Sequence, residues 1–224
     1  MNALFRFYQS SIGKKWVVAL TGLVLVGYIF GHLAGNLQMF MPPERINAYG
    51  AFLHSQPALL WVARIVMLIS FILHIVTTIK LVVENRAARP ERYEKNASVQ
   101  ARLATRTMAV SGLVVLAFVV FHILHFTTRS IDARFHALPG GEYDIYTMLV
   151  WAFQSPLICA IYVVGLFLLC LHLSHGLASL LQTIGLNSKG LATRIGVWGR
   201  VIAWLIFVGY ASIPVAVLVG FLKS

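Results

Sequence analysis

Four histidines lie inside long apolar stretches of this chain, one in each of four separate stretches: His32, His74, His122 and His172. An imidazole in hydrocarbon loses its water partners, so ionisable side chains inside membrane spans are rare and mark functional sites. A single histidine on an apolar face is more often a hydrogen-bonded core residue. A neutral imidazole is also a common metal ligand, and four such residues raise the question of whether the fold brings them together.

The composition predicts where these residues sit. The chain has 224 residues, of which 59% are hydrophobic and 11% charged, whereas soluble domains average about 25% charged residues. Crossing a hydrocarbon core takes about 20 helical residues. Five apolar stretches are that long, and we predict an all-α integral membrane protein, a five-transmembrane-helix bundle that forms a single membrane domain over residues 1–224, with helices at about 16–40, 57–83, 107–128, 151–181 and 195–222.

The net charge of +11 does not indicate a nucleic-acid partner, because its distribution follows a membrane topology. With the N-terminus in the cytoplasm, 13 of the 18 Lys and Arg residues fall in cytoplasmic segments, at positions 6, 14, 15, 80, 86, 89, 92, 95, 102, 106, 189, 194 and 200. Short cytoplasmic loops of membrane proteins carry such an excess. We expect the N-terminus inside and the C-terminus outside, and the basic segment from 86 to 106 could also contact a soluble partner.

The depths of the four histidines match in pairs. At about 1.5 Å per residue, His32 and His122 lie about 24 and 22 Å above the cytoplasmic ends of their helices, and His74 and His172 both lie about 14 Å above them. The two levels differ by roughly 8 to 10 Å on this count. Two facing histidines supply the axial ligands of a six-coordinate b-type haem. The sequence therefore predicts two haems b, with His32 and His122 on the outer iron and His74 and His172 on the inner one.

Two further histidines compete for these positions. His125 and His175 each follow a predicted ligand by three residues and share roughly its helix face. Depth favours His172 over His175 clearly and His122 over His125 weakly. A hydrogen-bonding role near the haem is the alternative for both competitors.

The remaining chemistry is limited. Two cysteines, Cys159 and Cys170, form no haem-attachment motif and are too few for an iron–sulfur cluster. Neither a dinucleotide-binding fingerprint nor a P-loop occurs. We expect no reaction on a water-soluble substrate by this chain alone.

Small and polar residues near the histidines have two interpretations each. Gly27, Gly31 and Gly35 recur every fourth residue, which suits either helix packing or room for a porphyrin. Asn36 and His54 are candidates for a quinone site near the outer haem. The alternative for His54 is a solvated interfacial histidine, and the alternatives for Asn36 are a cap of its helix end or orientation of the ligand His32. Four basic residues could neutralise haem propionates or simply extend their charges to the membrane surface: Lys14, Lys15, Arg106 and Arg194.

Several short motifs in this order carry a family resemblance. They are Ser11-Ile12-Gly13-Lys14-Lys15, Gly31-His32-Leu33-Ala34-Gly35-Asn36, Leu73-His74, Phe121-His122-Ile123-Leu124 and His172-Leu173-Ser174-His175-Gly176-Leu177. The chain resembles, over nearly its whole length, the single-polypeptide di-haem cytochrome b anchor subunit of succinate:quinone oxidoreductases and fumarate reductases, the bacterial complex II type.

The resemblance implies a function and partners. It implies electron transport in the bacterial inner (cytoplasmic) membrane, between an iron–sulfur subunit and a quinone, usually menaquinone, with the iron–sulfur subunit and a flavoprotein subunit docked on the cytoplasmic side. The chain would then be a subunit of an enzyme complex linked to the tricarboxylic acid cycle and embedded in membrane lipid. Cys170 stands where some relatives carry a glutamate thought to move protons, so we expect that route to be missing.

Two other functions stay open. The first is a b-type anchor of a different quinone-linked dehydrogenase, such as a hydrogenase or formate dehydrogenase. The second is a haem-free transporter or scaffold whose histidines relay protons or bind substrate. The sequence shows no inverted repeat or interrupted helix pair of the transporter kind.

Overall fold

The computed structural model describes residues 2–88, 99–141, 143–185 and 189–223. Those residues form helices and no strand. Five of the helical segments are long and apolar enough to cross a membrane, which confirms the predicted all-α five-helix membrane fold. They are formed by α2 (Ser11–Asn36) with a 3₁₀ turn (Leu37–Phe40), α4 (Pro57–Ala87), α5 (Val99–His122) with a π-helical turn (Ile123–Thr127), α7 (Pro156–Thr183) and α8 (Lys189–Leu218).

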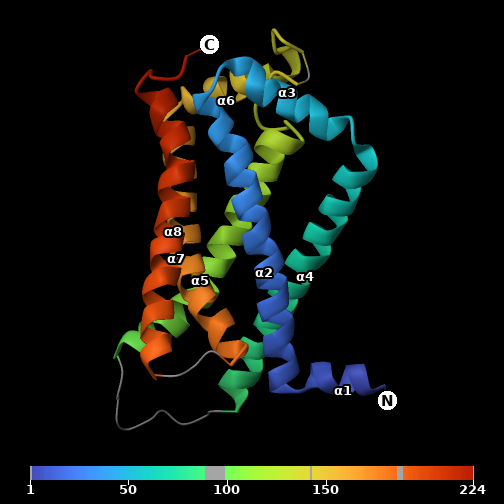
Figure 1. Ribbon diagram of the computed structural model, residues 1–224, viewed down its shortest axis with the longest axis vertical. Helices are drawn as coiled ribbons and strands as arrows, with labels where there is room; N and C mark the ends of the chain where they lie inside the picture. The colour runs from blue at the N-terminus through green and yellow to red at the C-terminus, as the bar shows by residue number, and fades with distance from the viewer. Residues whose placement is uncertain (1, 89–98, 142, 186–188, 224) are drawn as a thin grey trace.

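Three short α-helices and a 3₁₀ helix (Ala133–Ala137) lie outside these spans in the described residues. Figure 1 shows α1 (Ala3–Gln9) at one end of the bundle, and α3 (Pro43–His54) and α6 (Ile145–Phe153) across the other. We call the first end, which holds the starts of α2, α5 and α8, the basic end, because Lys14, Lys15 and Arg86 lie there. The other is the cap end. The topology predicted from charge would place the basic end in the cytoplasm.

One predicted boundary is wrong. The stretch 151–181 was expected to be a single helix, but α6 ends at Phe153 and α7 begins at Pro156. Ser155 accepts a hydrogen bond from the backbone of Ile158, and Pro156 takes the first helical position, where a missing N–H costs nothing. Both residues are helix-start signals that a hydrophobicity count overlooks.

An ion pair between a buried lysine and a half-exposed glutamate joins α2 to α4 at the basic end. The Nζ of Lys14 lies 2.5 and 2.7 Å from the two carboxylate oxygens of Glu84, and it also donates to the backbone carbonyl of Gln9 at 3.0 Å. Lys14 is buried. Its charge is therefore compensated within the protein, and removing Glu84 would leave the buried Lys14 without that partner, which is destabilising.

The packed core is uneven along the bundle. The larger buried cluster surrounds α6 at the cap end and includes Phe135, Val150, Phe153 and Tyr162. A smaller cluster joins α7 to α8 around Cys170 and Ala203. The side chains of α4 are mostly exposed, as suits a helix that faces hydrocarbon. The cap end thus holds most of the rigid packing.

Candidate metal centres

The structure brings the four predicted ligands together as two pairs. The rings of His32 on α2 and His122 on α5 have centroids 5.9 Å apart, with their planes at 82°. The rings of His74 on α4 and His172 on α7 have centroids 6.5 Å apart, with their planes at 69°. We call these the cap-end pair and the basic-end pair. Each pair joins two helices that are far apart in sequence.

These separations suit two ligands on opposite sides of one metal ion. A metal–imidazole bond of about 2 Å and a ring radius of about 1.1 Å give a separation of about 6 Å between the centroids of two trans ligands. Both observed values lie within half an ångström of that estimate. The geometry therefore fits axial ligation by both pairs.

The second ring nitrogen of each basic-end histidine meets a hydroxyl group. Nδ1 of His74 lies 3.2 Å from Oγ1 of Thr21, and Nδ1 of His172 lies 3.4 Å from Oγ of Ser111. Both hydroxyl groups donate their own proton to a backbone carbonyl one turn earlier. Each hydroxyl oxygen therefore accepts from Nδ1–H, which leaves Nε2 with the lone pair that a metal needs.

The cap-end pair is held differently. Nδ1 of His122 lies 3.5 Å from the hydroxyl oxygen of Tyr162. The ring of His32 stacks on Tyr28 at 5.4 Å and lies 6.1 Å from Tyr210. Within the described residues, the imidazole of His32 makes no hydrogen bond. Aromatic contacts thus replace one of the two hydrogen bonds found at the basic end.

The competing histidines occupy other positions. His125 is buried, and its Nδ1 lies 3.0 Å from the hydroxyl of Tyr162. It belongs to an aromatic cluster whose members are Phe121, His125, Phe126, Phe135, Phe153 and Tyr162. His175 is exposed and bonds the carbonyl of Leu171 through Nδ1. The π-helical turn that starts at Ile123 shifts the helix register just after His122.

A short repeat underlies the two pairs, and the sequence analysis missed it. Residues 21–32 read TGLVLVGYIFGH and residues 111–122 read SGLVVLAFVVFH. In each copy the hydroxyl residue bonds a basic-end histidine, and the final histidine, 11 positions later, joins the cap-end pair.

The 11 positions between the hydroxyl residue and the final histidine correspond to about 16 Å along both helices. The levels are thus farther apart than the 8 to 10 Å expected, because the helices extend beyond the apolar stretches used as reference points.

The second residue of each repeat copy leaves room for an imidazole. A Cβ added to Gly22 would lie 3.3 Å from Cε1 of His74, and one added to Gly112 would lie 3.5 Å from Cε1 of His172. The contact would be tight at Gly22 and an ordinary van der Waals contact at Gly112. A sequence search for Ser or Thr followed directly by Gly, with a histidine 11 positions after the hydroxyl residue, finds both Gly22 and Gly112.

The glycines of α2 serve two purposes. A Cβ added to Gly27 or Gly31 would meet no atom within 4 Å, whereas one added to Gly35 would lie 2.8 Å from the ring of Tyr49. Gly35 therefore permits helix packing. Gly27 and Gly31 leave open space on their side of α2, and this space beside His32 suits a planar ligand.

The predicted quinone residues lie at the cap end and are partly engaged. Asn36 donates through Nδ2 to the backbone carbonyl of His32 at 2.7 Å, so it contacts the backbone of a predicted ligand. His54 is exposed, donates through Nδ1 to the carbonyl of Gly50 at 2.9 Å, and lies 4.9 Å from the ring of Tyr143. Its Nε2 is left as an acceptor.

The residues predicted to neutralise haem propionates also differ in whether they already have a partner. Lys14 is committed to Glu84, so it is unsuited to neutralise a second anion. Lys15 and Arg194 are exposed at the basic end. The side chain of Arg106 lies outside the described residues, as does part of the predicted charged loop, at 89–98.

A pair of histidines favours a metal that arrives with its other coordinating atoms already in place. Among the described residues, no group of three or more His, Cys, Asp or Glu side chains could hold a metal ion. Two histidines alone leave a transition metal with most of its coordination sites unfilled. A porphyrin supplies four nitrogens, so the residues fit haem better than a bare ion.

The fold and these pairs define an all-helical, multi-pass membrane protein with two histidine pairs between its spans. Comparisons of the chain with family models, with curated proteins and with solved structures found no match in any of the three.

Proposed function

We propose that this chain is a di-haem cytochrome b that anchors a succinate dehydrogenase or fumarate reductase in the membrane and passes electrons between its iron–sulfur subunit and a quinone. The observation that carries the proposal is the meeting of four intramembrane histidines as two pairs, with ring centroids 5.9 and 6.5 Å apart. The family resemblance of the motifs around them supports the choice of enzyme.

The residues of the chain have distinct roles in this proposal. His74 and His172 would ligate one haem iron, and His32 and His122 the other. Bound haem would supply one-electron chemistry through its iron. Thr21 and Ser111 accept the Nδ1 protons of the basic-end histidines, which would leave the Nε2 lone pairs available to hold a haem iron and would raise their basicity.

Both ends of the bundle have a partner in the proposal. The basic end would meet the iron–sulfur subunit, with the flavoprotein subunit beyond it, because exposed cations such as Lys15 and Arg194 gather there. The cap end would bind the quinone, menaquinone in this kind of complex, with His54 as the proton-exchanging residue. The basic end would face the cytoplasm of a bacterial cell.

A spectrum tests the haem part of the proposal. The purified chain should show b-type absorbance bands in a reduced-minus-oxidised spectrum, with two haems per polypeptide. Replacement of any predicted ligand, such as His74→Ala, should remove at least one haem. His175→Ala is the matched control, because His175 is exposed, lies one turn from His172, and should leave both haems in place. A colourless wild type would contradict the proposal.

Co-purification tests the partner. A flavoprotein with succinate or fumarate activity, isolated with the chain from native membranes, would support the complex II assignment. A hydrogenase or formate dehydrogenase in its place would give the same spectrum with a different enzyme and would overturn that assignment alone.

A further inference from the structure

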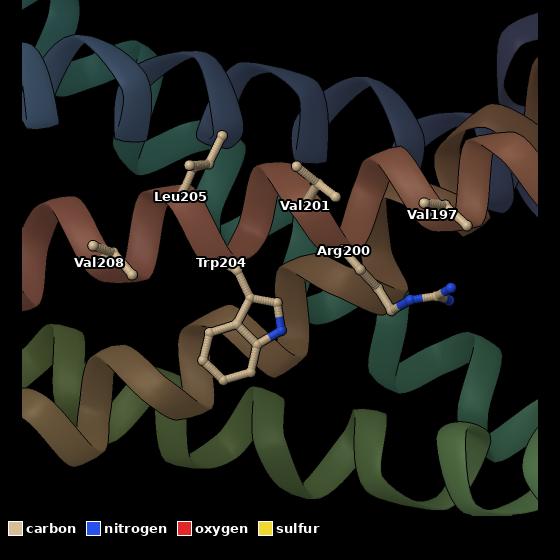
Figure 2. Close-up of a pocket in the computed structure, with 6 residues that line it drawn as sticks. All are labelled: Val197, Arg200, Val201, Trp204, Leu205 and Val208. Atoms are coloured by element: carbon tan, nitrogen blue, oxygen red, sulfur yellow. The ribbon is translucent and has the colours of Figure 1, made fainter.

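The outward face of α8 carries a shallow apolar groove between two rows of side chains. Figure 2 shows Val201 and Leu205 on one side of the helix and Arg200 and Trp204 on the other. Each of these pairs is spaced by four residues, so the groove runs along the helix. All six residues that line it are exposed on α8: Val197, Arg200, Val201, Trp204, Leu205 and Val208.

Arg200 has an unusual position for a charged residue. It lies four residues inside the membrane-spanning part of α8, which starts at Gly196, or about 6 Å from that limit. No carboxylate among the described residues pairs with it. Its Nη1 lies 3.8 Å from where a Cβ of Gly196 would be, so the guanidinium extends toward the basic end. A guanidinium at this depth requires water or an anion as partner.

Trp204 forms a fixed wall one turn deeper. Its ring packs edge-on against Phe207 at 5.5 Å and lies 6.1 Å from Phe167 on α7. Tryptophan is enriched where the hydrocarbon meets the lipid headgroups. The groove therefore has a cation at its mouth, an indole beside it and only aliphatic side chains farther in.

We propose that this groove binds one anionic phospholipid. The phosphate pairs with Arg200, and an acyl chain lies between Trp204 and the row of Val201 and Leu205. The distance from Arg200 to Val208 is about 12 Å along the helix, which accommodates the upper part of an acyl chain. Basic residues at the membrane surface favour anionic over zwitterionic lipids.

The charges argue against a second copy of this chain as the occupant. A partner helix would need an acidic residue at the depth of Arg200. The sequence has seven acidic residues, and the spans found among the described residues contain one of them, Glu84, which is paired with Lys14. A lipid phosphate supplies the missing anion without any such residue.

Lipid titration of the full-length protein tests the proposal. We would strip the detergent-solubilised chain of lipid and titrate it, in native mass spectrometry, with phosphatidylglycerol and with phosphatidylcholine of the same acyl chains. The wild type should bind one phosphatidylglycerol more tightly than any phosphatidylcholine. Arg200→Gln should weaken that binding about fivefold, and Arg200→Lys should retain most of it. Arg64→Gln is the matched control, because Arg64 also lies beside a tryptophan, Trp61, at 5.1 Å but near the cap end; it should leave the binding unchanged.

A second readout places the acyl chain. Phosphatidylglycerol with brominated chains should quench tryptophan fluorescence, and Trp204→Phe should remove most of the quenching that is saturable. Equal binding of the two lipids, or unchanged phosphatidylglycerol binding in Arg200→Gln, would overturn the proposal. So would a cross-linked homodimer formed through Trp204→Cys, which would make a second copy the occupant. None of these outcomes depends on haem.

Discussion

The two histidine pairs occupy similar places on the same kind of helices, yet the protein holds them by different means. At the basic end, both imidazoles meet an aliphatic hydroxyl of a neighbouring helix, Thr21 or Ser111. At the cap end, His122 meets the phenol of Tyr162 at a longer 3.5 Å, and His32 is held between aromatic rings.

The difference follows the packing around each pair. The cap end holds the larger core and the aromatic cluster, so ring contacts can fix an imidazole there by shape. The basic-end pair borders the smaller buried cluster, through Cys170 and Leu173 beside His172, and there directional hydrogen bonds orient the imidazoles. We infer that haem binding at the basic end depends on individual hydroxyl groups, whereas at the cap end it depends on the space that the surrounding side chains leave. The following experiments test this distinction.

Filling the surface beside His32 should have the largest effect. A Cβ at Gly31 would meet no atom of the described chain within 4 Å, so we expect Gly31→Leu to leave the fold intact. It should nevertheless abolish binding of the cap-end haem, because it occupies the surface next to the ligand, and haem content should fall from two to one. Retention of both haems would show that this surface is not part of the site. Gly35→Ala, against Tyr49, should instead reduce thermal stability.

Removing the hydroxyl groups should weaken the basic-end site selectively. Loss of a hydrogen-bond partner of a metal ligand costs about tenfold or more in affinity. Thr21→Val and Ser111→Ala should each raise the rate of haem loss to apomyoglobin about tenfold for one haem only. Thr21→Ser, which keeps the hydroxyl, should behave like wild type. An equal effect on both haems would contradict the assignment of these hydroxyls to one pair.

Tyr162→Phe should have a smaller effect, confined to the cap end. The long contact with His122 contributes little hydrogen-bond energy, so haem loss should increase by about threefold at most. His125 also loses its partner, which costs about 1 to 3 kcal/mol for a buried group. The low-spin electron paramagnetic resonance signal of one haem should shift while the other stays. A shift of both signals would show that Tyr162 does not act through His122 alone.

Lowering the pH should destabilise the cap end before the rest of the bundle. This is the smallest of the four predicted effects. Asp144 is buried at the start of α6 and accepts from Nδ2 of Asn47 on α3 at 3.1 Å. Burial alone would raise the pKa of Asp144, but hydrogen bonds hold it below its ordinary value; the donors are Thr147, Asn47 and Gly140.

Because the folded pKa is lowered, the carboxylate contributes stability that is present above about pH 3.9, the ordinary aspartate value, and is lost as the pH falls through the lower folded value. Asp144→Asn should cost about 1 kcal/mol at neutral pH and remove this acid sensitivity. Thermal unfolding between pH 3 and pH 7 measures both. Glu44→Gln, in the first turn of α3, is the control and should keep the acid sensitivity; its loss in that variant would contradict the role of Asp144.

Much of this arrangement could be predicted from the sequence because hydrophobicity and depth are one-dimensional. Five apolar stretches were enough for the fold class, and counting along them paired His32 with His122 and His74 with His172. The break before Pro156 was missed because the apolar stretch continues through it. The hydroxyl partners were missed because Thr21 and Ser111 become neighbours of the basic-end histidines only when the helices pack.

Haem content in paired variants tests the central claim most directly. The claim is that the four histidines act as two specific pairs. The double replacement His32→Ala with His122→Ala, which removes one pair, should leave one haem per polypeptide, as should His74→Ala with His172→Ala. The double replacement His32→Ala with His74→Ala, which takes one ligand from each pair, should leave none that is six-coordinate. If this last variant keeps a six-coordinate haem, or if removal of one pair empties both sites without unfolding the protein, the pairing is wrong.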